Sequence, residues 1–192
     1  AIRDVYKRQK ELAGEFKSTY ESLHKAVPEL NILIATYFGR LEDNVDFVKD
    51  LPIAGLHIDL DRAPEQLDAV LKAVASTKIG LSLGLVSGRN IWKTDLSKAV
   101  ELAKKAVETI GADRVQVASS SSLLHTPISL ANEKKLSEEV KDWFSFATEK
   151  CGEVATIGLA LQNSEAAQEK LAANAKSIAA RRDFETVSYT HL

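Results

Sequence analysis

Four short apolar segments, each followed by a stretch of helical periodicity, constrain the fold of this chain more than any other feature. They span residues 31–38, 55–60, 79–86 and 114–119. They are rich in β-branched residues and bounded by Gly, Pro, Asp or Ser, which is typical of strands. Strands that alternate with helices in this way pair in parallel through right-handed crossovers. The pattern therefore predicts a parallel sheet that packs against helices.

The segments between these strands carry apolar residues at helical spacing. After Pro64, which a first helical turn accepts, four residues stand at i, i+3, i+4 and i+7: Leu67, Val70, Leu71 and Val74. Residues 96–110 continue the same spacing, with Asp95 as the expected N-cap and Gly111 as the expected C-cap. Shorter helical patterns cover residues 41–51 and the region before the first strand.

A long helix is also expected from about residue 132. Its apolar stripe consists of Leu136, Val140, Trp143, Phe144, Ala147 and Cys151. Because Cys151 is the only cysteine of the chain and stands on this stripe, we expect it to be a small buried hydrophobic residue.

The polar residues inside the strands favour a barrel over an open, doubly wound sheet. His57 and Asp59 alternate with apolar neighbours, so one face packs on helices while the other carries polar groups, as near the upper interior of a barrel. Gly80, Gly84 and Gly88 are spaced by four and do not match G-x-G-x-x-G, and neither a Walker A loop nor a G-x-S-x-G elbow occurs. The expected fold class is α/β, a partial (β/α)8 TIM barrel of about four strand–helix units with parallel strands.

The composition argues against several classes of function. The 25 Lys and Arg residues and 27 Asp and Glu residues are interspersed, and only 6% of residues are aromatic, so no nucleic-acid partner is expected. No apolar run approaches the roughly 20 residues that span a bilayer, and no secretory signal is recognisable. One cysteine and four scattered histidines predict no internal disulfide, no complete zinc site and a cytoplasmic location.

The candidate functional residues follow the strands, because a barrel places its chemistry at the carboxyl ends of its strands. His57 and Asp59 lie on one face, about 7 Å apart at Cα for a rise of about 3.3 Å per residue. They could act as acid and base or as two metal ligands. They could equally be hydrogen-bonded polar residues of a barrel interior, and we favour this interpretation because no third ligand stands nearby.

Two loops add further candidates. After the third strand, Arg89 could bind a carboxylate or phosphate, with Asn90 beside it and Trp92 offering a stacking face. Alternatively, Arg89 forms a salt bridge to a neighbouring strand end while Trp92 covers the core. After the fourth strand, residues 119–122 and His125 suggest a serine nucleophile with its base, but we favour a loop whose serines satisfy backbone groups.

The same regions carry a resemblance to a known family. The chain is similar to cobalamin-independent methionine synthases in four segments, read in order: LPIAGLHIDLDRAPEQLD, LSLGLVSGRNIWKTDL, SSSSLLHTPISL and EKKLSEEVKDWFSFATEKCGEVATI. The earlier stretch NILIATYFGRLEDNVDFVKDLP fits as well. The resemblance covers roughly residues 10–185, and LVSGRNIW and SLLHTP at this separation are not a generic barrel signature.

The resemblance implies an enzyme of two β/α barrels that transfers a methyl group from methyltetrahydrofolate polyglutamate to homocysteine to make methionine. It implies a catalytic zinc in the C-terminal barrel, with ligands outside this segment. Residues 10–186 correspond to the second half of the N-terminal barrel, which packs against the C-terminal catalytic barrel of the same chain. No catalytic, cofactor-binding or metal-ligating residue is therefore expected here. The candidate rim or inter-barrel residues are His57, Asp59, Arg89, Asn90, Trp92 and His125.

Residues 1–9 and 187–192 do not fit the family pattern, and we expect them to be non-native ends derived from adaptor sequence. Three functional hypotheses result. The favoured one is a fragment of the methyltransferase, inactive alone, which supplies scaffold and inter-barrel surface. The second is a free-standing, non-catalytic binding module derived from the same barrel. The third is a small barrel enzyme that uses His57 and Asp59.

Overall fold

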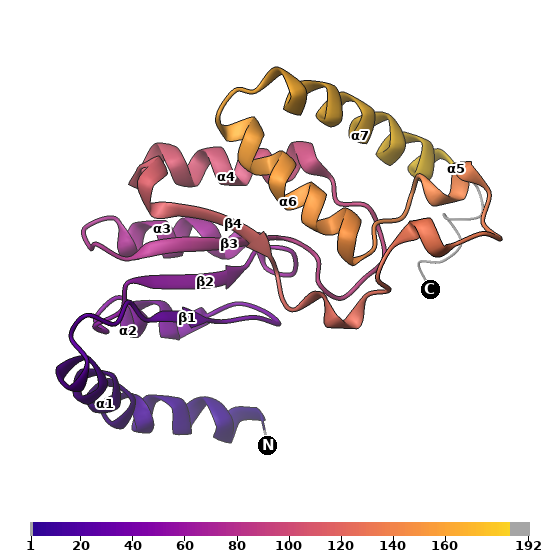
Figure 1. Ribbon diagram of the computed structural model, residues 1–192. Coiled ribbons are helices and arrows are strands. Elements are labelled where there is room, and N and C mark those ends of the chain that lie inside the picture. The colour runs from indigo at the N-terminus through magenta and orange to yellow at the C-terminus, as the bar shows by residue number, and fades with distance from the viewer. Residues whose placement is uncertain (1, 185–192) are drawn as a thin grey trace.

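The computed structural model describes the backbone of residues 2–184 and the side chains of residues 13–184. The expected non-native segment 187–192 lies outside the described residues, and of residues 1–9 only the helical backbone from residue 2 onwards is described. The described part contains one sheet with helices packed against it (Figure 1). The N-terminal helix α1 (Ile2–Ala26) lies beyond one edge of that sheet (Figure 1).

The sheet is parallel throughout, as the alternating pattern predicts. Its strands are β1 (Leu33–Ala35), β2 (Gly55–Asp59), β3 (Gly80–Val86) and β4 (Val115–Ser119), in the spatial order β1-β2-β3-β4. Sequential order with parallel pairing is the arrangement found in a β/α barrel. Since β1 and β4 each have one neighbouring strand among the described residues, the observed architecture is a partial barrel.

The two best-patterned helices form as expected. α3 (Leu67–Val74) follows a single 3₁₀ turn at Pro64–Gln66, and α4 (Leu96–Ile110) follows Asp95. The Asp95 carboxylate accepts a hydrogen bond from the backbone N–H of Lys98, and this confirms it as the N-cap. Gly111 ends α4 with a φ of 90°, a conformation that favours glycine.

Four shorter or later helices complete the described part. They are α2 (Val45–Val48), α5 (Glu138–Lys141), α6 (Ala147–Leu161) and α7 (Glu165–Asp183). α6 packs against β3, β4 and α4, while α7 packs on α4 and α6 (Figure 1). α6 therefore covers β3 and β4 alongside α4, and α7 packs outside these two helices.

The core lies between the sheet and these helices. Strand residues such as Leu56, Ile58, Leu81 and Leu83 are buried there against the apolar stripes of α3 and α4. The opposite face of the sheet carries His57, Ser82 and Gln116, which are directly paired across β2, β3 and β4. This division into an apolar outer face and a polar inner face matches the alternation expected of barrel strands.

The first strand is shorter than expected. Residues 31–38 were expected to form it, but the ladder contains only Leu33–Ala35. Thr36 still donates its N–H to the carbonyl of His57 at 3.1 Å, and the chain then turns away through Phe38 and Gly39, both at positive φ. Because two successive residues at positive φ cannot continue a pleated strand, the local turn ends the ladder despite the apolar sequence.

The expected long helix from residue 132 is wrong. One turn, α5, ends at Lys141, and residues 142–143 form a turn. Residues 144–146 form an extended segment in which Phe144 bridges to Trp92, and α6 begins only at Ala147. The extended segment bridges to the loop after β3: Ser145 donates its N–H to the carbonyl of Ile91 at 2.8 Å, and Lys93 donates to Trp143 at 2.9 Å. These long-range hydrogen bonds replace the intrahelical ones, and helical spacing in the sequence does not reveal them.

The new helix boundary also corrects the expectation for Cys151. Its side chain is exposed, because the buried face of α6 is set by Lys150, Glu153, Ile157 and Ala160, at i, i+3, i+7 and i+10. Cys151 follows Lys150 by one residue, about 100° around the helix, and points away from that face.

Among the described residues, no helix is both long enough and apolar enough to cross a bilayer.

Candidate functional site at the carboxyl ends of the strands

His57 is held in the polar row on the inner face of the sheet. Its Nδ1 lies 2.9 Å from the hydroxyl of Ser82, and its Nε2 lies 3.3 Å from the carbonyl oxygen of Ser120. Since a carbonyl can only accept, a proton on Nε2 satisfies this contact while Nδ1 accepts from Ser82. Both ring nitrogens are then engaged, and the imidazole is 7% exposed. His57 therefore ties β2 to β3 and to the loop after β4.

Asp59 is also engaged by protein groups. Its Oδ1 accepts from the N–H groups of Asp61 and Arg62 at 3.1 and 3.0 Å, and its Oδ2 accepts from the N–H of Phe38 at 3.1 Å. The side chain is 1% exposed, so these three bonds balance the loss of hydration of the carboxylate. Asp59 thus fixes the turns that follow β1 and β2, and its hydrogen bonds are those of a structural carboxylate.

Two glycines let the strand ends approach the serine loop closely. A Cβ at Gly84 would lie 2.7 Å from the Cα of Ser120, and a Cβ at Gly88 would lie 2.5 Å from the hydroxyl of Ser121. The N–H of Gly88 donates to the hydroxyl of Ser120 at 3.3 Å. Glycine is therefore required sterically at both positions, so that the loops after β3 and β4 can pack against one another.

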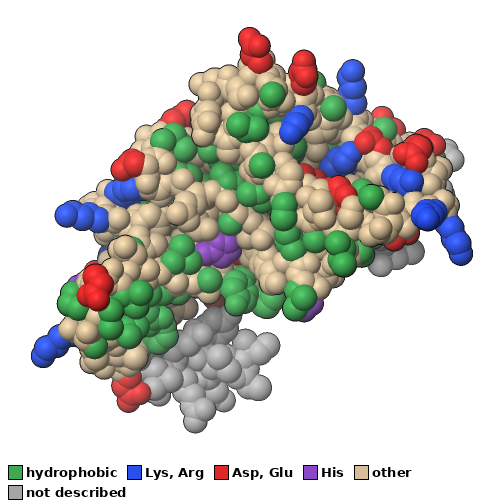
Figure 2. Space-filling model, in the orientation of Figure 1, with side chains coloured by type: hydrophobic (Ala, Val, Ile, Leu, Met, Phe, Trp, Pro, Cys, Tyr) green, Lys and Arg blue, Asp and Glu red, His purple; other side chains and the backbone are tan. Residues whose placement is uncertain are grey.

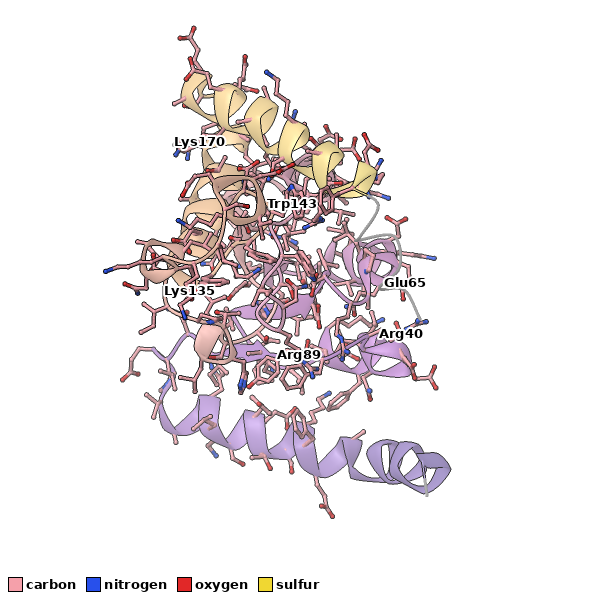
Figure 3. All side chains as sticks on the ribbon, turned by 90° about the vertical axis from the view of Figure 1, so that its right-hand side faces the viewer. Arg40, Glu65, Arg89, Lys135, Trp143 and Lys170 are labelled. Atoms are coloured by element: carbon pink, nitrogen blue, oxygen red, sulfur yellow. The ribbon has the colours of Figure 1, made fainter. Side chains whose placement is uncertain are left out.

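Arg89 and Asn90 lie on the loop after β3. The guanidinium of Arg89 is stacked over the ring of Phe38, with Cζ 4.6 Å from the ring centroid, and this contact joins the ends of β1 and β3. No ion pair of Arg89 occurs among the described residues, so the alternative of a salt bridge to a strand end is not realised there. Asn90 accepts from the N–H of Trp92 at 3.1 Å and shapes the turn. Figure 3 looks onto this end of the sheet and labels Arg89.

Trp92 is 38% exposed and lies between two elements from later in the chain. Its ring is 5.1 Å from the ring of Phe144, and the guanidinium of Arg181 lies 5.3 Å from its centroid. Arg181 also donates to the carbonyls of Lys93 and Trp143, at 3.3 and 3.5 Å. Burial lowers the pKa of the Arg181 guanidinium from its ordinary value, and nearby Asp95 opposes this shift.

His125 stands apart from these contacts. It is exposed on a 3₁₀ turn at Leu123–His125. Ser122 accepts from the N–H of Leu124 at 3.2 Å and caps that turn, as expected for a serine that satisfies a backbone group. The structure therefore does not bring Ser122 and His125 together as nucleophile and base.

Large apolar side chains are exposed along the same rim. They follow β1, β3 and β4, and they are Tyr37, Phe38, Trp92, Leu124 and Ile128. Leu124 is 85% exposed and Ile128 is 77% exposed, values that are unusual for large aliphatic residues. Figure 2 shows exposed hydrophobic side chains along the lower edge of the molecule in that view. A concentration of apolar groups at one end of a sheet is typical of a surface that another domain or protein covers.

The candidate residues do not form a metal site. Within residues 13–184, no group of three or more His, Cys, Asp or Glu side chains is arranged to hold a metal ion. The oxygens of Asp59 are directed at backbone N–H groups, both nitrogens of His57 face protein groups, and Cys151 points to solvent on α6. A zinc ion needs three or four converging ligands, and these residues do not provide them.

A layer of buried polar residues lies behind the rim, and the sequence patterns did not lead us to predict it. Asn174 on α7 accepts from the N–H of Leu96 at 3.0 Å and donates to the carbonyl of Thr94 at 2.9 Å. Glu153 on α6 accepts from the N–H of Thr94 at 3.1 Å, and Ser177 donates to the carbonyl of Asp142. The available signal was the helical spacing of Lys150, Glu153, Ile157 and Ala160, in which polar residues occupy buried positions.

Lys150 is the most unusual member of this layer. Its side chain is fully buried at 0% exposure, and its ammonium donates to the carbonyl of Trp92 at 3.0 Å. Burial lowers the pKa of this ammonium below its ordinary value, while the carboxylates of Glu153 and Asp61 oppose that shift. Lys150 thus holds the rim loop from beneath, through a contact to the backbone of the residue that stacks on Arg181.

Comparison with known proteins shows which family and which proteins this chain is similar to. Residues 4–111, more than half of the chain, match the family model described as the N-terminal domain of cobalamin-independent synthase. The chain is 46% identical over 174 residues to a probable 5-methyltetrahydropteroyltriglutamate–homocysteine methyltransferase of Schizosaccharomyces pombe, covering 90% of this chain and 22% of that protein.

Two further yeast proteins named as 5-methyltetrahydropteroyltriglutamate–homocysteine methyltransferases are similarly close. The one from Candida albicans is 48% identical over 171 residues, 88% of this chain and 22% of that protein. The one from Saccharomyces cerevisiae is 52% identical over 150 residues, 78% of this chain and 19% of that protein. The chain thus spans about a fifth of the length of the curated relatives that it matches.

Proposed function

The chain belongs to the cobalamin-independent synthase family, whose N-terminal domain it matches, and on this premise we propose that it forms part of a methyltransferase. That enzyme transfers a methyl group from a methyltetrahydropteroylpolyglutamate to homocysteine and so makes methionine. The proposal draws on the names of the relatives, which specify donor and acceptor. We propose that residues 10–186 supply scaffold and inter-barrel surface, and that methyl transfer takes place elsewhere in the longer protein.

The open sheet is the observation that carries this proposal. β1 and β4 each leave one edge without a neighbouring strand among the described residues, whereas a closed barrel pairs every strand. Unpaired parallel edges are a liability that proteins cover with further structure. The four parallel strands and the one-fifth coverage of the relatives support the same interpretation, that further strands of a longer chain complete this barrel.

The exposed apolar rim is proposed as the surface that meets the C-terminal catalytic barrel. Tyr37, Phe38 and Trp92 offer aromatic groups there, and Leu124 and Ile128 offer aliphatic ones. Aromatic residues concentrate at such interfaces because they bury large areas with little loss of conformational entropy. We propose that five further residues shape or border this rim rather than act on substrate: His57, Asp59, Arg89, Asn90 and His125.

We propose that the longer enzyme contains zinc, uses a folate as methyl donor and is located in the cytoplasm. We propose that the other barrel of the longer enzyme holds a zinc ion, which would activate the homocysteine thiol there. A cytoplasmic location is supported by the single cysteine of the chain. Residues 1–9 and 187–192 are proposed to be non-native, although the family match itself extends to residue 4.

A chimaera tests the proposal. The matching segment of the Saccharomyces cerevisiae relative is replaced by the corresponding residues of this chain, and the gene is expressed in a yeast strain that lacks its own enzyme. Growth without methionine is expected, because the segment supplies only scaffold and surface. A matched chimaera with Leu83→Asp, which places a charge in the core, is expected to fail.

The same experiment distinguishes the alternatives. A chimaera that is produced in full and folded but inactive would contradict the proposal. The isolated 192-residue chain is expected to show no methyl transfer, so turnover by that chain would favour a small enzyme instead. A native stop codon directly after this segment in the gene would favour the free-standing binding module.

A further inference from the structure

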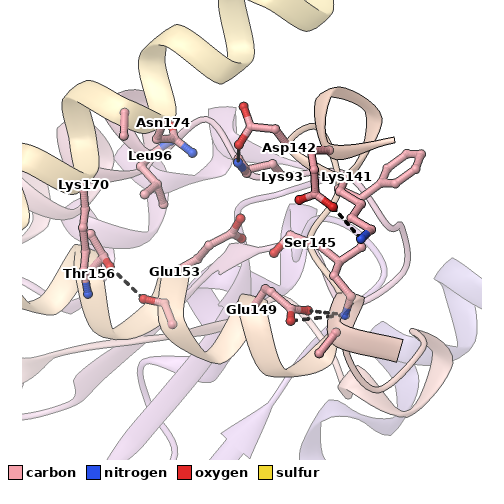
Figure 4. Close-up of a pocket in the computed structure, with 16 residues that line it drawn as sticks. Lys93, Leu96, Lys141, Asp142, Ser145, Glu149, Glu153, Thr156, Lys170 and Asn174 are labelled. Carbon is pink, nitrogen blue, oxygen red and sulfur yellow. Dashed lines mark hydrogen bonds and ion pairs between the residues drawn. The ribbon is translucent and has the colours of Figure 1, made fainter. Parts of the chain in front are cut away.

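A cavity of about 680 Å³ lies behind the rim, among α5, α6 and α7 (Figure 4). It is separate from the polar row of His57 and Ser82, because neither residue lines it. Its walls come from α5, α6, α7, the start of α4 and the loop segments beside them. Apolar groups such as Leu96 and Phe144 line part of it, and charged groups line the rest. A partly apolar cavity of this size with a few convergent polar groups is typical of a small-molecule site.

Most of the charged groups around the cavity have partners within the protein. Lys93 pairs with Asp142 at 2.6 Å, and Lys141 pairs with Glu138 at 2.8 Å. Glu149 accepts hydrogen bonds from the N–H of Leu130 and from the hydroxyl of Ser129. These groups therefore hold the walls in place, and in the two ion pairs the charges are balanced locally.

Two buried polar atoms in the walls lack partners. Glu153 uses Oε1 to accept from the N–H of Thr94, but its Oε2 has no hydrogen-bond partner among the described residues. The same holds for the hydroxyl of Ser145. Glu153 is 8% exposed and Ser145 is 1% exposed, and Figure 4 shows both side chains directed into the same part of the cavity. An unsatisfied buried acceptor destabilises the folded state, and more so when it is charged.

Both groups are held firmly from outside the cavity. Ser145 belongs to the extended segment, where its N–H donates to the carbonyl of Ile91 at 2.8 Å. Glu153 is fixed through Thr94, whose carbonyl is in turn bound by Asn174. A carboxylate oxygen and a hydroxyl oxygen are therefore presented together on rigid elements before any ligand arrives. Such preorganisation reduces the entropy lost on binding.

We propose that this cavity binds a small molecule that carries a primary ammonium group, with the ammonium donating to Glu153 Oε2 and Ser145 Oγ. A cationic donor fits best because the free acceptor is a carboxylate, and charge-assisted hydrogen bonds are the stronger ones. Lys150 and Arg181 interact electrostatically with Glu153, but the ammonium of Lys150 donates to the carbonyl of Trp92, and neither cation donates a hydrogen bond to Glu153 Oε2. The apolar wall at Leu96 and Phe144 accommodates a short hydrocarbon chain. The site is independent of the proposed methyltransferase function.

Calorimetric titration of the 192-residue chain with n-butylamine at neutral pH tests the proposal, with 1-butanol as a neutral probe of similar size. Butylammonium is expected to bind with a Kd of about 1–5 mM, at least about tenfold more tightly than butanol. Glu153→Gln keeps an acceptor for Thr94 but removes the free charged oxygen, and should weaken binding by about tenfold or more. Ser145→Ala should weaken it by about threefold to tenfold.

Glu138→Gln is the matched control, because this carboxylate also lines the cavity but is 90% exposed and pairs with Lys141. It should change the Kd by less than about twofold, as expected for a solvent-screened charge. Circular dichroism and Tm of each variant show whether it remains folded. Absence of saturable binding by the folded wild-type chain would overturn the proposal, as would equal weakening by Glu138→Gln and Glu153→Gln. A crystal structure with the amine present but only water between Ser145 and Glu153 would overturn it as well.

Discussion

Two pairs of helices in this molecule are attached by different means: α3 and α4 on one side, and α6 and α7, which carry the buried polar layer, on the other. α3 and α4, which we call the apolar layer, bury apolar stripes that include Leu71 and Val100. α6 and α7 bury Ile157 and Ile178 as well, but the same faces also carry Lys150, Glu153, Thr156, Asn174 and Ser177. The first layer is thus held mainly by the hydrophobic effect, and the second depends in addition on hydrogen bonds to loop backbone.

This difference has consequences for the site. Apolar packing positions a helix without directing it to particular backbone groups, because the hydrophobic effect is non-directional. Hydrogen bonds from Asn174 and Glu153 reach specific groups of Thr94 and Leu96, in the segment that follows the rim loop. The polar layer therefore fixes the rim and creates the cavity, while the apolar layer supplies most of the stability.

The largest effect is expected from cutting into the apolar layer. Leu71→Ala removes a side chain that is 3% exposed in α3, and should lower the free energy of unfolding by about 2–5 kcal/mol. Urea unfolding followed by circular dichroism measures this. Lys72→Ala, an exposed change one residue along, should leave the stability within about 0.5 kcal/mol. Similar losses for both variants would show that α3 is not held by apolar burial.

A smaller loss is expected from the polar layer. Asn174→Ala leaves the N–H of Leu96 and the carbonyl of Thr94 without their partner, and should cost about 1–3 kcal/mol in the same assay. Gln168→Ala, at an exposed position of the same helix, is the control and should be nearly neutral. If Asn174→Ala also left the free energy of unfolding unchanged, hydrogen bonds to loop backbone would not contribute to holding α7 in place.

The buried lysine gives the polar layer a pH dependence, with an effect expected to be smaller than that of Asn174→Ala. Burial lowers the pKa of Lys150 in the folded chain below the ordinary value of 10.5. Between these two pKa values the unfolded chain binds more protons, so the stability contributed by this group rises with pH. Urea unfolding from pH 7 to pH 10 should therefore show the wild type gaining stability relative to Lys150→Met.

The control for this titration is Lys104→Met, an exposed lysine on α4. Its stability should follow the wild-type curve in parallel across the same pH range, because an exposed ammonium titrates alike in both states. Parallel curves for wild type and Lys150→Met would instead mean that the buried ammonium has its ordinary pKa.

The smallest effect is expected at the one ion pair that connects α3 to α4 among the described residues. Lys105 and Asp68 are 2.5 Å apart, but their side chains are 52% and 69% exposed. Solvent screens such a pair, so Asp68→Ala should cost no more than about 0.5 kcal/mol. A double-mutant cycle with Lys105→Ala measures the coupling energy. Coupling above about 1 kcal/mol would mean that electrostatics contributes to the apolar layer as well.

The rim illustrates how far sequence patterns extend. Polar residues after each strand marked the correct end of the sheet, because parallel strands bring their carboxyl ends together. Their partners could not be predicted. The stacking of Arg89 on Phe38 and the contacts of Asp59 with three N–H groups depend on turns whose conformations arise from tertiary packing.

The parallel strand–helix alternation, the capped helix α4 and the family could all be predicted from the sequence, since each is encoded in local periodicity or contiguous motifs. Three features depend on tertiary contacts: where the helix after residue 132 breaks, which face of α6 is buried and how the cavity forms. These contacts join residues that are far apart along the chain. Asn174 binds Thr94 and Glu153 binds the same residue from far away in sequence, and no local pattern records such pairs. The alternating strands define a partial barrel, and contacts between distant polar residues complete its rim.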